Sequence, residues 1–381
     1  MFLDEKIAND FRNTINSSQI FRKSEKLKEK FNLICVVMDR ISSAVAYLNN
    51  HSDFPATEED FVCFLVYACM IKDAVSKLYE NVYHIKPEYI HQKKYFIDVR
   101  QYGKIVFTDE NRPTDDVFFE YLRSMAFAHP FDTGHRNRSF IDKKETQYCP
   151  WVIVQGNVVG IRVYTSSDKF VIEDITFPFE NLKEYIKTRY EYLKQLTEWA
   201  KKEIFAQDEE WAKHKAARLK NVFETIQSIK QIYEERFYET YEVEKIEQFL
   251  RCEITVDANT ENISRYKEAL KRSVYKLCDA LDNVEECDLC SATDEVFALP
   301  RVAHSMMRYQ LEKIYCYLDD ESDYWDRQWG LKQAEAFSKE FAKKWVVFDF
   351  DKMTDDEIKL TVAAACYLEA NEQESDNKKS S

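Results

Sequence analysis

Apolar residues recur at helical spacing along most of the chain. Between residues 31 and 48 they return every three or four positions, which predicts a long amphipathic helix. The run from Phe61 to Met70 is apolar on every side, a pattern typical of a helix at the centre of a core. By the same criterion we predict helices over residues 20–50, 57–83, 114–128, 179–206, 208–236, 263–283, 292–320, 325–343 and 354–370.

The period changes between about residues 150 and 177. Three short apolar runs are separated there by turn residues at 155–157 and 166–168, which predicts a small antiparallel β-meander. Three of the five glycines lie within residues 134–160, in agreement with turns being concentrated in this region. The expected fold class is therefore mainly α: a helical bundle with the meander and a second helical region.

A chain of 381 residues is long enough for more than one domain. We expect residues 1–206 to form a helical domain with the meander as an insertion, and residues 207–370 to form a C-terminal helical domain. Residues 371–381 contain no apolar side chain, so we expect a disordered tail.

Composition limits the surroundings and the partners of the chain. The net charge of −14 argues against a surface that holds nucleic acid by bulk electrostatics, although a local basic groove remains compatible with it. The N-terminus lacks the basic start and apolar core of a signal peptide, and no apolar run reaches the length of a bilayer span. We therefore expect a cytoplasmic protein without membrane contact, with reduced thiols.

The cysteines offer one candidate metal motif. Cys287 and Cys290 form a CxxC pair, with His304 and Cys316 further along the chain. The second pair lacks the short spacing between ligands that zinc sites use, and it falls within a predicted helix. We therefore expect no metal and no cofactor.

The stretch from Tyr121 to Pro130 carries the candidate chemistry. Arg123 and His129 are six positions apart, which on a regular helix means a rise of about 9 Å and a rotation of about 240°, so they would not share a face. Pro130 disfavours the α conformation for the residue before it, so we expect His129 to leave the helix. The arginine offers a fork for phosphate oxygens, and histidine titrates in the range that suits proton transfer.

A basic loop follows this stretch. Residues 121–144 contain five Lys or Arg and two Asp, a local charge of +3 in a chain of −14. Such a patch is expected where a phosphate backbone is held. His135 is a second candidate for proton transfer, and Arg136 and Arg138 are candidate phosphate ligands; a solvated turn is the alternative interpretation.

Arg123, five intervening residues, His129 and then a proline, on an apolar helix, resemble the Arg-x4–6-His motif of the HEPN domains. These are helical bundles, many of them metal-independent ribonucleases of prokaryotic defence and toxin systems. Ser124 stands where family members often carry Asn, Asp or His, and we include it with His135, Arg136 and Arg138 as an expected substrate-binding residue. The resemblance implies a homodimer with a composite site that cleaves RNA through attack of the 2′-OH.

In that site His129 would transfer protons and Arg123 would stabilise negative charge on the phosphate. The resemblance further implies a possible antitoxin or regulatory protein partner. Two alternatives stay open. The arginine can instead pair with Glu120 while the histidine caps helix carbonyls, and the protein can be a non-catalytic helical interaction or regulatory protein with a degenerate HEPN-like fold.

Overall fold

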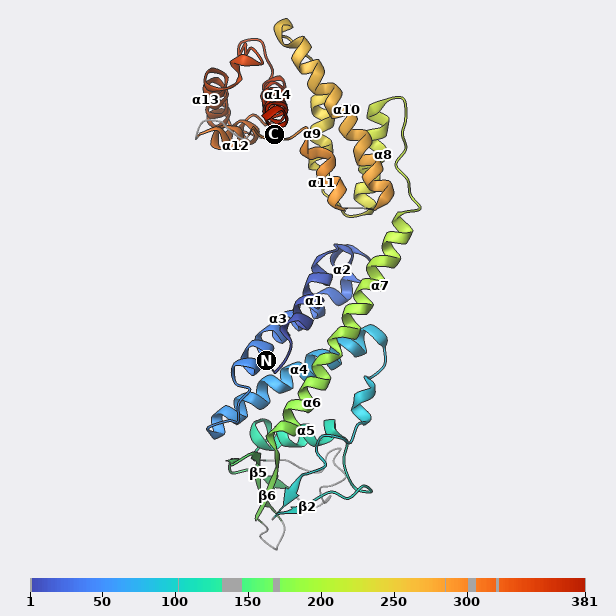
Figure 1. Cartoon of the computed structure of the whole chain (residues 1–381), viewed down its shortest axis with the longest axis vertical. Coiled ribbons are helices and arrows are strands. Elements are labelled where there is room, and N and C mark those ends of the chain that lie inside the picture. The colour runs from blue at the N-terminus through green and yellow to red at the C-terminus, as the bar shows by residue number, and fades with distance from the viewer. Residues whose placement is uncertain are drawn as a thin grey trace. The chain divides into compact units, whose positions relative to one another are not determined.

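The computed structural model describes residues 2–101, 103–131, 146–166, 172–284, 286–300, 306–319 and 322–380. The chain divides into two compact units, Met1–Phe205 and Ala206–Ser381, and the boundary expected after residue 206 lies one residue away (Figure 1). Helix α7 (Leu193–Trp211) runs through this boundary. The predicted fold class is confirmed, since both units are built mainly from helices and the first also carries a small antiparallel sheet.

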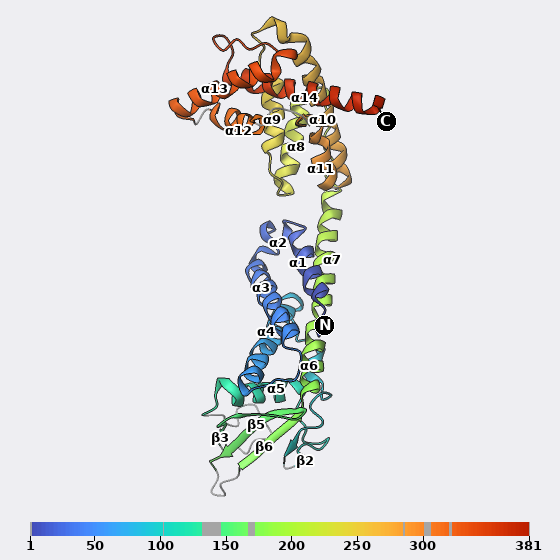
Figure 2. The same ribbon diagram turned by 60° about the vertical axis from the view of Figure 1, so that its left-hand side comes forward.

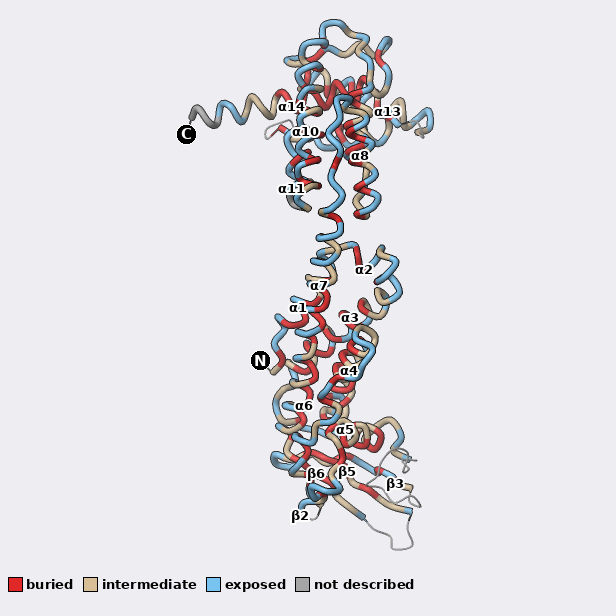
Figure 3. The backbone as a smooth tube through the Cα atoms, turned by 90° about the vertical axis from the view of Figure 1, so that its right-hand side faces the viewer, coloured by how far each residue is buried: buried red, intermediate tan, exposed pale blue. Residues whose placement is uncertain are grey.

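The first unit is a helical bundle with the sheet at one end. Its other helices are α1 (Glu5–Asn16), α2 (Ile20–Lys23), α3 (Lys28–Asn50), α4 (Glu58–Tyr83), α5 (Asp115–Arg123) and α6 (Phe179–Glu191), with a 3-10 turn η1 (Glu88–His91) and a π-helical turn η2 (Ser124–Ala128). Helix α3 packs along α4, and α4 packs along α6. The facing sides of these helices carry the buried residues (Figure 3).

Local sequence explains where α4 begins. The Thr57 side chain accepts a hydrogen bond from the backbone of Asp60, and the Asp60 carboxylate accepts one from the backbone of Thr57. This capping box satisfies two N–H groups that the helix leaves unpaired. The predicted helix over residues 20–50 is interrupted instead, because Ser24 is extended (ψ 133°) between α2 and α3.

The sheet contains the predicted meander and three further short strands. Its strands are β1 (Arg100–Gln101), β2 (Lys104–Ile105), β3 (Gln147–Tyr148), β4 (Val152–Gln155), β5 (Val158–Thr165) and β6 (Ile172–Pro178). The order is β2-β1-β6-β5-β3, with β4 also paired to β5, and every pairing is antiparallel (Figure 2). Gly156 (φ +64°) opens the two-residue turn between β4 and β5, a position that favours glycine.

The second unit has two cores that share one helix. Its elements are α8 (Val222–Glu235), α9 (Tyr241–Arg251), η3 (Asp257–Asn259), α10 (Thr260–Asn283), α11 (Glu286–Asp294), α12 (Met307–Tyr317), α13 (Tyr324–Glu340), η4 (Ala342–Lys344) and α14 (Asp355–Ser380). Leu360 and Ala364 of α14 belong to the core formed with α8–α11, whereas Ile358 and Val362 belong to the core formed with α12 and α13. The first half of α14 is therefore buried on opposite faces.

Three predictions about this unit are wrong. The single helix expected over residues 292–320 is instead divided between α11 and α12, because residues 295–300 are not helical. The single helix expected over residues 208–236 ends at Trp211 and resumes at Val222. The buried Arg236 guanidinium donates hydrogen bonds to the carbonyls of Trp211 and His214 (2.8 and 3.2 Å), and so binds the backbone at the point where α7 ends. Arg236 lies more than twenty positions after these carbonyls, so the local pattern of apolar residues does not predict the contact.

The disordered tail expected over 371–381 is instead helical as far as Ser380. The Asn371 side chain donates to the carbonyl of Tyr367 (2.8 Å), and the Ser375 hydroxyl donates to the carbonyl of Asn371 (2.9 Å). A polar segment that continues an already formed helix requires no new nucleation, which explains the helix despite its composition.

Helix α3 is long and apolar enough to cross a membrane by length and composition alone, a test that core helices of soluble proteins also pass. In the most apolar 18-residue stretch of this helix, 39% is buried within the protein. An apolar helix with this much accessible surface marks α3 as a candidate contact face.

Candidate functional site

Helix α5, which carries the candidate motif, is fixed at its N-terminus by a buried carboxylate. Asp115 is 1% exposed and accepts hydrogen bonds from the backbone N–H groups of Lys94, Tyr95 and Phe96 (2.9, 3.0 and 3.3 Å). Thr114 caps the helix through its hydroxyl, as the sequence predicts. The first turn of α5 is thereby bound to the segment that follows η1.

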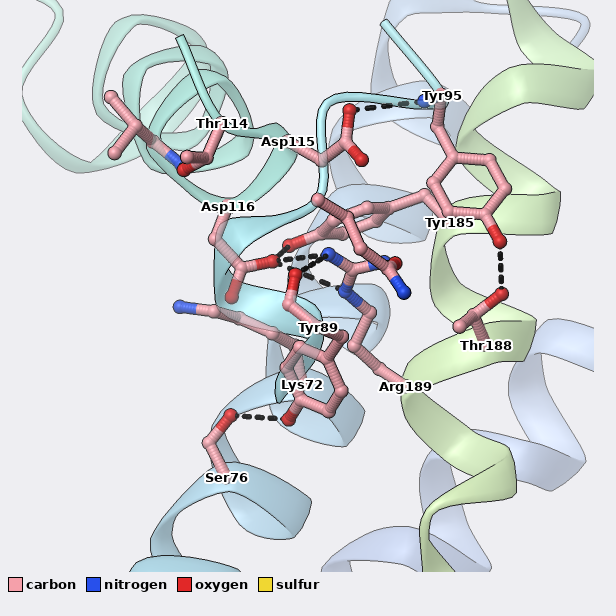
Figure 4. A network of polar contacts seen from close by, with 12 residues as sticks. Lys72, Ser76, Tyr89, Tyr95, Thr114, Asp115, Asp116, Tyr185, Thr188 and Arg189 are labelled. Atoms are coloured by element: carbon pink, nitrogen blue, oxygen red, sulfur yellow. Dashed lines mark hydrogen bonds and ion pairs between the residues drawn. The ribbon is translucent and has the colours of Figure 1, made fainter. Parts of the chain in front are cut away.

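Asp116 forms a second, charged connection from α5 to the bundle (Figure 4). Its Oδ1 accepts hydrogen bonds from Nη2 (2.7 Å) and Nε (3.1 Å) of Arg189 on α6, and from the hydroxyl of Tyr185 (2.8 Å). The fully buried Arg189 guanidinium also lies over the Tyr185 ring, 3.8 Å from its centroid. Burial raises the pKa of Tyr185 well above its usual value, so the phenol stays protonated as a donor.

The sequence patterns described above do not predict this network. A signal was present: an arginine four positions after a tyrosine on the apolar face of a helix requires a buried acceptor. The acceptor comes from a segment 73 residues away, which the sequence alone does not reveal. Its effect is to fix the orientation of α5.

At its C-terminus α5 presents Arg123. The guanidinium pairs with Glu120, with Nη2 2.9 Å and Nε 3.0 Å from Oε2, and Glu120 also pairs with Lys72 of α4. Partial burial by itself raises the pKa of Glu120, but Lys72 and Arg123 lower it by more, so the net direction is downward. The alternative pairing of Arg123 with Glu120 is therefore confirmed.

The chain then leaves α-helical geometry. Residues 124–128 form a π-helical turn closed by a hydrogen bond from the His129 N–H to the Ser124 carbonyl (2.7 Å). His129 has φ −143° and ψ 52°, outside the α region, as the following proline predicts. Turns of this type are frequent at functional sites because they redirect side chains relative to the preceding helix.

The predicted site residues differ in their accessibility. His129 is exposed, and Arg123 is half-buried with a side-chain exposure of 31%. Ser124 is 4% exposed, so the structure offers little accessible surface for its expected contact with substrate. His135, Arg136 and Arg138 lie outside the described residues. Among the candidates that the structure describes, Arg123 and His129 are thus the accessible ones, and both belong to the end of one helix.

An apolar groove lies beside this end of α5. A cavity of about 440 Å³ opens between α3 and α4 and is closed at one side by Phe127 of the π-helical turn. Val36 in this groove is 57% exposed, and Phe131, two residues after His129, is 82% exposed. Burial raises the pKa of the lining Cys69 to about 12, so that thiol is not a nucleophile at neutral pH.

Within the described ranges, no group of three or more His, Cys, Asp or Glu residues is arranged to hold a metal ion. Cys290 and Cys316 of the motif considered above are exposed free thiols, whereas His304 lies outside those ranges. The chemistry open to the end of α5 is that of an accessible imidazole and a partly neutralised guanidinium.

Comparison with known proteins adds no relative from which roles could be transferred. No protein-family model, curated protein sequence or solved structure matches the chain.

Proposed function

We propose that the protein is a HEPN-type, metal-independent endoribonuclease of a prokaryotic defence or toxin system. The observation that carries the proposal is the end of α5, where a rigidly held helix leads to Arg123 and a π-helical turn then presents His129 to solvent. The fixed position of α5 supplies the preorganisation that a catalytic pair requires. RNA is the proposed substrate, and no cofactor takes part.

In the proposed reaction, the ribose 2′-oxygen attacks the adjacent phosphorus while the bond from phosphorus to the 5′-oxygen breaks. His129 accepts the proton of the 2′-OH, and a second protonated imidazole supplies a proton to the leaving 5′-oxygen. Arg123 stabilises the charge that accumulates on the phosphate oxygens. The products are a 2′,3′-cyclic phosphate and a free 5′-hydroxyl, and no metal ion is needed.

The second imidazole in this scheme is the histidine of a second copy of the chain. A homodimer is proposed because the groove beside α5 is apolar, and because Val36 and Phe131 remain accessible next to the motif. Apolar surface next to a catalytic end is the feature expected of a self-complementary twofold contact. The proposal further places the protein in the cytoplasm, away from membranes, with an antitoxin or regulatory protein as a possible partner.

A specific observation favours a second function, that of a non-catalytic interaction or regulatory protein. The Arg123 guanidinium pairs with Glu120, and Lys72 pairs with both Glu120 and Asp73. Two cations therefore face two carboxylates at this end of α5. A neutralised arginine binds phosphate less well than a free one. The variant Glu120→Gln, which removes the carboxylate, distinguishes the two functions. If the protein is a nuclease, the variant should bind RNA more tightly than the wild type; if the ion pair is only structural, RNA binding should be unchanged.

The direct test is cleavage of varied single-stranded RNAs in EDTA. Arg123→Ala and His129→Ala are compared with two matched variants, Arg12→Ala and His84→Ala. Arg12 forms a helix-surface pair with Asp39, and His84 is an exposed residue at the end of α4. We expect the motif variants alone to lose activity; cleavage that persists in both, or a wild-type protein that cuts none of the RNAs, would falsify the proposal.

A further inference from the structure

The second unit contains a cavity that the proposed nuclease chemistry does not use. It has a volume of about 320 Å³ and is bounded by α9, residues 296–299, α12 and α14. Phe297, Leu311, Tyr315 and Ala363 give it apolar walls, while Arg308 and Glu312 are exposed lining residues. Cavities of this size, with a few polar groups in an apolar wall, are typical sites for small molecules.

Lys245 of α9 places an amine among aromatic rings in this cavity. Its Nζ lies 3.8 Å from the ring centroid of Tyr315 and 5.1 Å from that of Phe297. The rings of Phe249 and Tyr241 follow at 5.7 and 6.0 Å. Aromatic faces attract an ammonium but do not provide a counter-anion.

The nearby carboxylates make their hydrogen bonds and ion pairs to groups other than Lys245. Glu242 accepts a hydrogen bond from the Thr293 hydroxyl (2.7 Å), and Glu312 pairs with Lys313 (2.8 Å). Among the residues that the structure describes, Lys245 has no hydrogen bond or ion pair. A cation removed from water without an anionic partner is costly, so the cavity favours an anion from outside.

The electrostatics of the amine agree with this arrangement. Burial, together with the charge of Lys359, lowers the pKa of Lys245 to about 8, while Glu242 and the buried Cys366 thiol oppose this shift. Lys359 is itself paired with Asp356, and from α12 the charged groups that line the cavity are Arg308 and Glu312. An anion bound next to Lys245 would restore the ammonium.

We propose that this cavity is a binding site for a small organic carboxylate with an apolar body. The carboxylate pairs with Lys245, and the apolar body packs against Phe297, Leu311 and Ala363. Arg308 adds positive charge as a further lining residue. This inference is independent of the proposed nuclease activity, because it rests on residues of the second unit alone.

The test is calorimetric titration of the full-length protein with octanoate, and with octan-1-ol and octylammonium as comparators of the same chain length. We expect one site that prefers octanoate. Near pH 8, octanoate binding should be accompanied by proton uptake, seen as a dependence of the heat on the buffer, because a pKa of about 8 leaves part of the Lys245 population unprotonated before binding. Lys245→Met should weaken octanoate binding by about tenfold or more.

Two further variants keep the test decisive. Lys276→Met removes a lysine of α10 that pairs at the surface with Glu295, and it should bind octanoate as the wild type does. Lys245→Arg, which retains a permanent charge, should bind octanoate without proton uptake, and it decides the question if Lys245→Met does not fold. Equal binding of octan-1-ol, unchanged affinity in Lys245→Met, or no octanoate binding at concentrations on the order of millimolar overturns the proposal.

Discussion

Removal of the buried arginine beneath the motif helix should destabilise the first unit strongly. Arg189→Met keeps an unbranched apolar side chain but deletes both hydrogen bonds to Asp116 (2.7 and 3.1 Å) and the contact with the Tyr185 ring. The Asp116 carboxylate, whose side chain is 13% exposed, would then retain only the Tyr185 hydroxyl of the three hydrogen bonds that its Oδ1 accepts from α6. Loss of one partner of a buried ion pair costs about 3–5 kcal/mol, because the other charge stays buried without compensation.

The assay is urea unfolding, with hydrogen exchange followed by mass spectrometry to assign the transition of residues 1–205. The matched variant is Arg12→Met, which removes an arginine paired with the 73%-exposed Asp39 and should cost less than about 1 kcal/mol. The double variant Asp116→Asn/Arg189→Met should recover part of the lost free energy of unfolding. Equal, small losses in Arg189→Met and Arg12→Met would refute the assignment of Arg189 as the residue that fixes α5.

Two further predictions concern the sheet and the charged end of α5. Gly160→Ala should lower the free energy of unfolding of the first unit by about 1–3 kcal/mol, because its Cβ would lie 2.0 Å from the Ile175 carbonyl oxygen. Gly156→Ala meets no neighbouring atom and is disfavoured only by its positive φ, so it should lower the free energy of unfolding by less. A smaller decrease in Gly160→Ala than in Gly156→Ala would contradict the close approach of β5 and β6. The pKa of Glu120 is lowered from 4.5 in the folded state, so its stabilising contribution is present above that value and lost as the pH falls through the folded pKa. The stability difference between wild type and Glu120→Gln should therefore shrink below about pH 4.5, as measured by thermal unfolding across pH; a constant difference would argue against the ion pair.

The sequence predicts the fold where the determining interactions are local. The start of α4 at Thr57 and the start of α5 at Thr114 both follow from capping residues next to an apolar run. The turn at Gly156 follows from a glycine between two alternating runs. These features depend on residues within a few positions of one another, so a single sequence is sufficient to predict them.

Long-range interactions set the features that the sequence does not reveal. The break after α7 depends on Arg236, and the placement of α5 depends on Arg189, each in contact with groups more than twenty positions away. The sequence does suggest the pairing of Arg123 with Glu120 as one alternative, because the two are three positions apart on one helix. Its connection to Lys72 requires the packing of α4 against α5, which helical period does not specify.

The most direct test of the proposed function is the rate of RNA cleavage in EDTA by the wild type and by His129→Ala. Loss of a general acid–base group should lower the rate constant by about 10²-fold or more, while His84→Ala cleaves as the wild type does. The RNA fragments should end in 2′,3′-cyclic phosphates. A rate constant in His129→Ala equal to that of the wild type would contradict the assignment of this end of α5 as a catalytic site.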